Sequence, residues 1–474
     1  MSTMRSVSMM ILFTLMVCTY TFGQGKRKAA QLDSIFSVLH QQQQFNGVVL
    51  ITEKGKVIYK KGFGIRNEKT KALNNSRTQF ELASCTKQFT AGAIVLLHRQ
   101  GKLQYTDKIT QYIPELQHWD AVTINDLLHH TSGVGEFLVD MQTGWDKNGI
   151  VTNEDVISFY AARKDTLQFA PQSRHRYNNT NYVLLATIIE RVSGKDFGTY
   201  LAENIFKPLK MKHTLVYNSR LSPKKMKKRA TGYVWEKGSF AKVTGEHPGY
   251  ADSMVYYLDG AVGAAKVTST VDDILKWVNA LKTNSFFTPA EFEQMTAVTK
   301  TSSGKNIPYG FGLDVSKGEN KFSYGHTGSW DGYVSFIYHN QLKDRTMIIL
   351  QNFKLGVYPF DNIVQVLEEQ PLVVEYKKKI TVPEGVVSRY AGTFIDEKNP
   401  EEEHMITYKE GHLFYNTKRV KWDMRFFPVS ENEFQGIRQG GVDGVLRFTS
   451  LPNGELKMEM LEYGTVIGSG ILKN

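Results

Sequence analysis

The pattern of apolar residues changes near residue 380, and this change limits what the chain can fold into more than any other feature. Before this point, segments with apolar residues at helical spacing, such as residues 31–43, alternate with strand-like runs. Beyond it, short runs of alternating polarity follow one another, separated by frequent turn residues. The sequence therefore predicts a mixed α and β domain over residues 24–375 and a small all-β domain over residues 385–474.

Local signals place several elements within the first domain. Two apolar runs on either side of a glycine-containing turn predict a β-hairpin over residues 46–64. Thr123 and Thr270 are each followed three residues later by an aspartate, which is the pattern of a capping box at a helix N-terminus. A further apolar stripe predicts a helix that ends at Gly194. Alternation over residues 322–327 predicts a strand.

Residues 1–23 have the features of a secretory signal peptide. Arg5 precedes a short apolar run, and Gly23 supplies a small residue near the expected cleavage point. The run is shorter than the roughly 20 apolar residues that a membrane-spanning helix requires. A retained N-terminal anchor is the alternative interpretation. We expect cleavage near Gly23 and a periplasmic or secreted protein.

The charge of the chain bears on its partners. The formal net charge is +11, and basic residues cluster at 224–229 and 377–379. A solvated surface is the simpler interpretation of these clusters, and electrostatic association with an anionic envelope surface is the alternative. No nucleic-acid-binding motif is present, so nucleic acid is not an expected partner.

The strongest chemical signal is a serine and a lysine three residues apart at the start of a predicted helix. Residues three apart share a helix face, so the Lys87 amine can reach the Ser84 hydroxyl. A serine hydroxyl becomes a good nucleophile when a neighbouring base removes its proton, and a lysine can serve if burial lowers its pKa. A helix-capping serine beside an exposed lysine is the simpler alternative for this pattern taken alone.

Two further segments carry polar residues that could complete such a site. Tyr177 and Asn179 lie two apart ahead of a helical segment, where a phenol can carry a proton and an amide can bind substrate. His326, Thr327 and Gly328 end the predicted strand, and the glycine would allow a ligand backbone to approach closely. A polar turn and an ordinary strand end are the alternatives for each segment alone.

Taken together, the three segments resemble the serine β-lactamase and penicillin-binding protein superfamily. They are similar above all to its class C β-lactamase-related branch, which includes D-alanyl-D-alanine carboxypeptidases, D-amino-acid amidases and some esterases. The matching segments are Ser84–Cys85–Thr86–Lys87, Tyr177–Asn178–Asn179 and His326–Thr327–Gly328, with framework segments at residues 127–133 and 268–273. The resemblance covers residues 28–370. It implies an α+β fold of the β-lactamase/transpeptidase type, in which helices flank an antiparallel sheet and form an insertion within it.

The resemblance also implies the role of each site residue. Ser84 would form an acyl-enzyme that water hydrolyses, while Lys87 and Tyr177 share the proton transfers in an order that stays open. The backbone N–H groups of Ser84 and Ser329 would form the oxyanion hole. Asn179 would hold the acyl side of the substrate. His326 and Thr327 would steer its carboxylate or amide end.

One departure from the family pattern narrows the expected activity. Where β-lactamases generally carry a lysine, this chain has His326, which is only partly charged near neutral pH and holds a carboxylate less firmly. We therefore expect a hydrolase of D-amino-acid peptides, amides or esters, with a small-molecule or peptide substrate that could derive from the cell wall. A penicillin-binding or sensing protein with little turnover, or a weak β-lactamase, is the alternative.

The remaining reactive side chains do not suggest a second chemistry. Cys85 lies about 100° around the helix from Ser84, so a packed core thiol is expected. Cys18 would leave with the signal peptide, and the mature chain then has no pair for a disulfide. No metal-ligand spacing is present around His129 and His130, and we expect neither a metal nor a cofactor.

Overall fold

The computed structural model describes residues 25–142, 149–224, 226–235, 242–244, 253–283, 285–418 and 425–473. The chain forms two compact units: Gly47–Lys354 makes up one, and the described residues on either side of it make up the other. The predicted signal peptide lies outside the described residues, and the predicted domain limits stay a prediction. Within the described part of the chain, no helix combines the length and the apolar character needed to cross a membrane.

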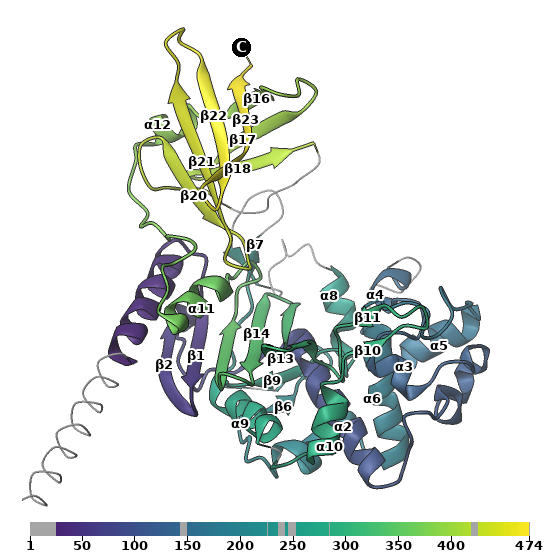
Figure 1. Ribbon diagram of the computed structural model, residues 1–474. Helices are drawn as coiled ribbons and strands as arrows, with labels where there is room; N and C mark the ends of the chain where they lie inside the picture. The colour runs from purple at the N-terminus through teal and green to yellow at the C-terminus, as the bar shows by residue number, and fades with distance from the viewer. Residues whose placement is uncertain are drawn as a thin grey trace, which may run out of the picture. The chain divides into compact units, whose positions relative to one another are not determined.

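The first unit is built on a six-stranded antiparallel sheet that joins the two ends of the unit. Its strands are β1 (Gly47–Glu53), β2 (Lys56–Phe63), β12 (Asp314–Gly318), β13 (Lys321–Trp330), β14 (Tyr333–Asn340) and β15 (Arg345–Gln351). The order is β12-β13-β14-β15-β1-β2, and β1 pairs with β15 so that Gly47 lies opposite Gln351. The intervening chain supplies the helices (Figure 1). This arrangement confirms the predicted fold class.

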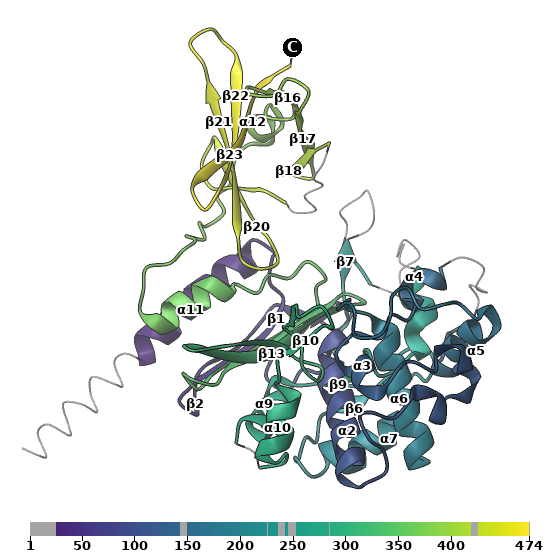
Figure 2. The same ribbon diagram turned by 45° about the vertical axis from the view of Figure 1, so that its right-hand side comes forward.

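Helix α6 contacts α2, α3 and α5 beside this sheet, and α9 packs against β1 and β15 (Figures 1 and 2). The helices of the unit are α2 (Lys87–Arg99), α3 (Ile124–Leu128), α4 (Phe137–Asp140), α5 (Asn153–Arg163), α6 (Asn179–Ser193), α7 (Phe197–Leu201), α8 (Ser253–Tyr257), α9 (Val271–Lys282) and α10 (Pro289–Met295). Large apolar side chains join them, as where the rings of Phe89 and Trp277 lie 4.5 Å apart between centroids. Burial of such surfaces stabilises the unit. Its one cysteine, Cys85, is free, so no disulfide adds to this stability.

The predicted helix boundaries follow from their caps. Thr123 and Asp126 form the predicted capping box at the start of α3, and the Thr270 side chain accepts the Asp273 N–H at the start of α9. Gly194 ends α6 in the left-handed conformation that favours glycine. These local predictions are confirmed because each depends on groups within one turn of the helix end.

Short strands complete the first unit and hold the segment that bears Ser84. A three-stranded sheet has the order β5-β9-β6, where β5 is Phe80–Glu81, β9 is Val267–Ser269 and β6 is Leu215–Val216. Three two-stranded pairs also form, namely β3 (Ile65–Asn67) with β4 (Ala72–Leu73), β7 (Val234–Trp235) with β8 (Lys242–Val243), and β10 (Thr299–Lys300) with β11 (Asn306–Ile307). Short 3₁₀ segments also occur, including η5 (Leu258–Gly260). Strand β5 leads directly into the nucleophile segment.

The structure corrects the expected setting of Ser84. Ser84 lies in a 3₁₀ segment, η1 (Ala83–Thr86), and not in the first turn of an α-helix, because α2 begins at Lys87. Ala83 has a φ of 48°, a left-handed conformation that turns the chain sharply after β5. The tighter 3₁₀ turn is common at the start of an α-helix, and here it places Ser84 just before the N-terminus of α2.

The second unit contains the N-terminal helix, residues 25–41, and the β-rich C-terminal part. Its other helices are α11 (Phe360–Glu368) and α12 (Glu384–Ser388), and its strands are β16 (Gly392–Asp396), β17 (Glu403–Lys409), β18 (His412–Thr417), β19 (Phe427–Pro428), β20 (Glu433–Ile437), β21 (Asp443–Ser450), β22 (Leu456–Glu462) and β23 (Thr465–Leu472). The sheet order β18-β17-β16-β23-β22-β21-β20-β19 ends with strands that meet at a Leu413–Phe426 bridge, so the sheet closes on itself. The predicted C-terminal β domain is confirmed.

The packing around Gly263 yields a stability prediction. Gly263 has a φ of 94°, and a Cβ there would lie 2.2 Å from the Tyr182 carbonyl oxygen of α6. Gly194 has a comparable φ of 70° with nothing within 4 Å of its Cβ position. We expect Gly263→Ala to lower the free energy of unfolding by about 3 kcal/mol, because steric overlap adds to backbone strain. Gly194→Ala should cost about 1 kcal/mol. Urea unfolding followed by tryptophan fluorescence measures both, and equal losses would contradict the steric argument.

Candidate active site

Ser84 and Lys87 are brought together as the sequence predicts. The Lys87 Nζ lies 3.1 Å from the Ser84 Oγ, across the junction between η1 and α2. Ser84 is partly exposed and lines a pocket of about 110 Å³, whereas Lys87 is fully buried behind it. The hydroxyl therefore faces the space where a ligand can bind, and the amine contacts that hydroxyl from inside the protein.

Lys87 has two further polar neighbours, and both are acceptors. Its Nζ lies 2.9 Å from the Asn179 Oδ1 and 3.0 Å from the Ala264 backbone oxygen. Burial lowers the pKa of Lys87 to about 7, and the negative charge of Glu136 opposes this shift only in part. Near neutral pH a large share of these side chains therefore carries a neutral amine.

Tyr177 lies on the other side of the nucleophile. Its side chain lines the same pocket as Ser84, and the Lys87 Nζ lies 4.9 Å from the centre of its ring. Tyr177 is 39% exposed, and partial desolvation of its hydroxyl raises its pKa above the ordinary value, so the phenol keeps its proton near neutral pH. The predicted trio of Ser84, Lys87 and Tyr177 thus converges within the first unit.

Asn179 begins α6 and is held by a residue that the sequence did not single out. The Glu136 Oε2 accepts the Asn179 backbone N–H at 2.7 Å and the Asn179 Nδ2 at 3.1 Å. Because the amide nitrogen faces Glu136, the amide oxygen faces Lys87, which fixes the orientation of the side chain. Glu136 follows the framework segment at residues 127–133, and this proximity was the one signal in the sequence that could have pointed to it.

His326 lies close to the site, but its ring is engaged inside the protein. Its Nε2 lies 2.9 Å from the Tyr309 hydroxyl, its Nδ1 contacts the Thr327 backbone oxygen, and only 4% of the residue is exposed. Burial lowers the pKa of His326, and Lys87 lowers it further. The imidazole is therefore neutral at physiological pH. Tyr309 is a second residue that the sequence did not single out, since only the fold brings it to β13.

Gly328 has a packing role that differs from the one expected. A Cβ at Gly328 would lie 2.3 Å from the Leu82 backbone oxygen and 3.0 Å from the Ser84 backbone nitrogen. The missing side chain thus lets β13 approach η1, whereas the sequence suggested an approach by a ligand. Thr327 is half-buried, and Ser329 is exposed and lines the same pocket as Ser84.

Cys85 is a packed thiol, as predicted. It is fully buried, its Sγ lies 3.1 Å from the His326 backbone oxygen, and the Ser335 Oγ lies 3.2 Å from the same sulfur. Burial raises the pKa of the Cys85 thiol to about 12. A thiol that holds its proton this firmly is a poor nucleophile.

Apart from the polar residues already described, the pocket around Ser84 is lined mainly by apolar side chains. Its apolar lining comes from the following side chains: Ala83, Phe137, Leu138, Leu258, Ala261, Ala264, Ala265 and Trp330. Lys266 also lines the pocket. Across the described ranges, no three His, Cys, Asp or Glu side chains are grouped so that they could hold a metal ion. The site thus offers a nucleophile, a near-neutral amine, a phenol and an apolar wall.

Comparisons with known proteins agree with this arrangement. The relatives include penicillin-binding protein 4* of Bacillus subtilis strain 168, which is 32% identical over 420 residues, 87% of this chain and 92% of that protein. Among solved structures, the octameric penicillin-binding protein homologue from Pyrococcus abyssi has a TM-score of 0.63 at 23% identity and covers 93% of this chain and 99% of its own. A D-amino acid amidase from Ochrobactrum anthropi SV3 has a TM-score of 0.57 at 24% identity. This match covers 73% of the present chain and 99% of the amidase. These two likenesses support the fold.

A family model described as Beta-lactamase matches residues 32–368, which span both the helical insertion and the six-stranded sheet. This match and the relative in Bacillus subtilis agree with the motifs quoted from the sequence. The chain therefore belongs to the beta-lactamase family and is a serine hydrolase of the acyl-enzyme type.

Proposed function

We propose that this protein is a secreted hydrolase that cleaves D-amino-acid peptides, amides or esters through an acyl-enzyme on Ser84. The observation that carries the proposal is the position of the Lys87 amine, 3.1 Å from the Ser84 hydroxyl and with a pKa lowered to about 7 by burial. Among the solved structures with this fold is a protein named D-amino acid amidase. That name motivates the choice of substrate class.

The hydrogen bonds of Lys87 support its role as the base. A neutral amine has two N–H donors and one lone pair. Asn179 Oδ1 and the Ala264 backbone oxygen can only accept, so they take the two N–H groups. The Ser84 hydroxyl is the one neighbour of the three that can donate, and it therefore faces the lone pair. In its neutral form, Lys87 is already oriented to take the serine proton.

The reaction then proceeds by acyl transfer. As Lys87 takes the hydroxyl proton, the Ser84 Oγ bonds to the substrate carbonyl carbon, and the carbonyl oxygen becomes an oxyanion. The backbone N–H groups of Ser84 and Ser329 would stabilise this oxyanion. The C–N or C–O bond breaks as the leaving group takes a proton by way of Lys87 or Tyr177. Water then attacks the ester, giving the acid and restoring Ser84.

The state of His326 favours substrates without a charged end. A neutral imidazole held by Tyr309 has no cationic charge with which to bind a carboxylate. Amides, esters and internal peptide bonds place no free carboxylate beside the scissile bond. We therefore favour amidase, esterase or endopeptidase activity over carboxypeptidase activity for this site.

A nucleophile substitution tests the proposal directly. We expect Ser84→Ala to lower turnover of a p-nitrophenyl ester and of a D-Ala-D-Ala peptide by at least about a thousandfold, because no acyl-enzyme can form. Mass spectrometry should find a fluorophosphonate adduct on Ser84 in the wild type. Unchanged turnover in Ser84→Ala would refute the proposal. A stable penicillin adduct without turnover of the ester or the peptide would favour the alternative of a binding or sensing protein.

The pKa of Lys87 predicts a pH dependence. Below about pH 7 the protonated amine cannot accept the serine proton, so kcat/KM for an uncharged ester should rise about tenfold per pH unit and level off above pH 7. Lys87→Arg should remove activity throughout this range, because a guanidinium stays protonated. Lys282→Arg, on α9, serves as the control and should keep the wild-type profile. A profile without an inflection between pH 6 and about 8 would contradict the assignment.

Paired substrates test the specificity. We expect D-Ala-D-Ala amide to be cleaved at least about tenfold faster than D-Ala-D-Ala with a free carboxylate, because the His326 imidazole, the group expected to hold that end, is neutral. His326→Lys should narrow this preference by introducing a cation at the same strand position. The measurement is kcat/KM for both peptides in both proteins at pH 7.5. Equal values for the two peptides in the wild type would refute the preference.

A further inference from the structure

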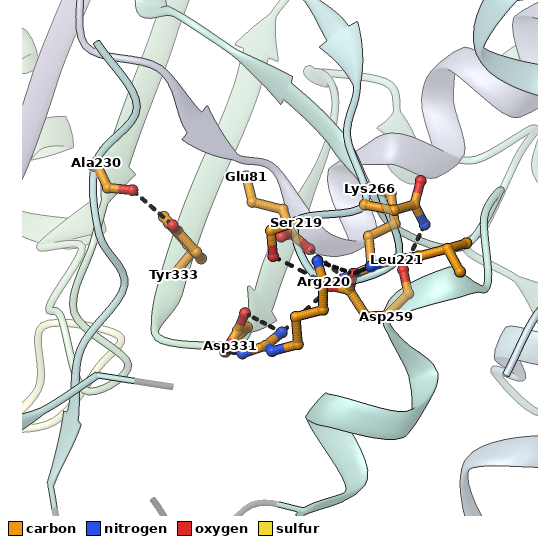
Figure 3. A network of polar contacts seen from close by, with 10 residues as sticks. Glu81, Ser219, Arg220, Leu221, Ala230, Asp259, Lys266, Asp331 and Tyr333 are labelled. Carbon is orange, nitrogen blue, oxygen red and sulfur yellow. Dashed lines mark hydrogen bonds and ion pairs between the residues drawn. The ribbon is translucent and has the colours of Figure 1, made fainter. Parts of the chain in front are cut away.

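A group of buried charges adjoins the pocket and has no part in the acyl transfer described above. One of its members, Lys266, lines the pocket together with Ser84. Lys266 is 1% exposed, and its Nζ lies 2.9 Å from the Asp259 Oδ1 and 3.6 Å from the Glu81 Oε1. Asp259 is fully buried, and Glu81 is 1% exposed. Figure 3 shows these side chains converging from three separate segments of the chain.

Arg220 extends this group toward β13. Its guanidinium lies 3.3 Å from Asp259, and it forms two contacts with the Asp331 carboxylate at 2.9 and 3.0 Å. Asp259 also accepts the backbone N–H groups of Arg220 and Leu221 (Figure 3). The five side chains of Glu81, Lys266, Asp259, Arg220 and Asp331 form one continuous series, which we call the buried charge network.

Each end of the network adjoins a segment that borders the nucleophile. Glu81 lies three residues before Ser84, at the end of β5. Asp331 directly follows Ser329 and Trp330, which line the pocket with Ser84. Asp259 lies in η5, between Leu258 and Ala261 in the pocket wall. The network therefore ties three parts of the wall to one another through charged side chains.

Val267, the residue after Lys266, forms hydrogen bonds with residues on both sides of Ser84. The Val267 backbone oxygen accepts the Leu82 N–H at 2.8 Å, and the Val267 N–H donates to the Thr86 Oγ1 at 3.1 Å. Any shift of the chain at Lys266 is thus passed to η1 through its immediate neighbour.

Lys266 holds its place at a conformational cost. Its φ is 88°, in the left-handed region that L residues rarely adopt. Asp331, at the other end of the network, has a φ of 46°. Such conformations persist where surrounding contacts over-determine them, and they cluster at functional sites. Here the surrounding contacts include the ion pairs of the Lys266 side chain and the hydrogen bond from the Tyr217 N–H to the Lys266 backbone oxygen at 2.9 Å.

Glu81 depends on Lys266 for its charge balance. Among the described residues, neither Glu81 carboxylate oxygen has a hydrogen-bond partner, and Lys266 forms its ion pair. Removing one member of a buried pair leaves an uncompensated charge, whereas removing both members is often tolerated. This difference allows a structural role to be separated from a positioning role.

We propose that Lys266 is a positioning residue, whose buried charge network fixes η1 relative to the Ser329–Trp330 end of β13. The proposal rests on the proposed function, because the geometry it fixes is that of the Ser84 acyl transfer. The two segments, η1 and the Ser329–Trp330 end of β13, lie near opposite ends of the sequence of the first unit. The network links them through ion pairs, in addition to their packing.

The test compares Lys266→Met with Lys282→Met in the full chain. Lys282 is also largely buried and pairs with Asp344 at 2.5 Å, but it lies on α9 and outside the network. At a temperature well below both melting points, we expect Lys266→Met to acylate Ser84 with a p-nitrophenyl ester at least about tenfold more slowly. Lys282→Met should match the wild type. Lys266→Arg keeps the positive charge and should recover most of the rate.

A double variant separates positioning from stability. Lys266→Met combined with Glu81→Gln removes both charges of the Lys266–Glu81 pair, while Asp259 keeps its pair with Arg220, so the melting temperature should recover part of the way toward that of the wild type. The acylation rate should stay low, because the ionic connection between η1 and β13 through Lys266 is still missing, although the two segments still pack directly at Gly328. If the rate recovers along with the melting temperature, the role of Lys266 is structural only and the proposal fails.

Amide hydrogen exchange gives a measure that does not depend on turnover. Peptides covering residues 80–90 and 326–334 should exchange faster in Lys266→Met than in Lys282→Met, because the two segments lose their common anchor. If the wild type has no esterase or peptidase activity, the proposed function fails, and this exchange result still decides whether the network holds the two segments. Equal exchange in the two variants overturns the positioning proposal.

Discussion

The burial of the Lys87 amine is the constraint on which the rest of the first unit depends. Water is excluded from this side chain, so its polar contacts must come from the protein. They come from three places: Ser84 in η1, Asn179 at the start of α6, and Ala264 ahead of β9. One small group thus requires three segments, distant in sequence, to meet at fixed distances. The fold supplies that meeting point, and in return the burial lowers the pKa of the amine.

The need to hold Ser84 at a fixed distance from the Lys87 amine explains why the sheet packs closely against η1. β13 can approach η1 because Gly328 has no side chain, and Ser335 on β14 donates to the Leu82 backbone oxygen at 2.6 Å. β9 holds the opposite side of the segment through Val267. The residues on either side of Ser84, Leu82 and Thr86, are therefore held by hydrogen bonds from β14 and β9. A nucleophile held in this way loses little entropy when it reacts.

The sequence predicted what depends on short spacing, and the family resemblance predicted that Tyr177 and Asn179 meet Lys87. Neither predicted which further residues support the site through tertiary contacts. The Ser84–Lys87 interval, the caps of α3 and α9 and the C-terminal β domain follow from local patterns, and the structure has them. Glu136 and Tyr309 could not be predicted, because each gains its role from a partner more than fifteen residues away, at Asn179 and His326. The burial of His326 was missed for the same reason: a strand pattern shows which residues alternate, but not which neighbour covers them.

The distribution of charge follows a common logic in both parts of the site. The titratable groups nearest Ser84 are neutral near pH 7 or become so: burial lowers the pKa of Lys87 and His326 and raises the pKa of Tyr177. Ionisable side chains joined by ion pairs are instead gathered in the network from Glu81 to Asp331, where burial raises the pKa of Glu81. Paired charges cost little further reorganisation, and neutral groups do not compete with the charge that develops on a reacting carbonyl. The ion pairs therefore lie in the buried charge network that adjoins the site. Lys87 is left as the group whose protonation governs the chemistry.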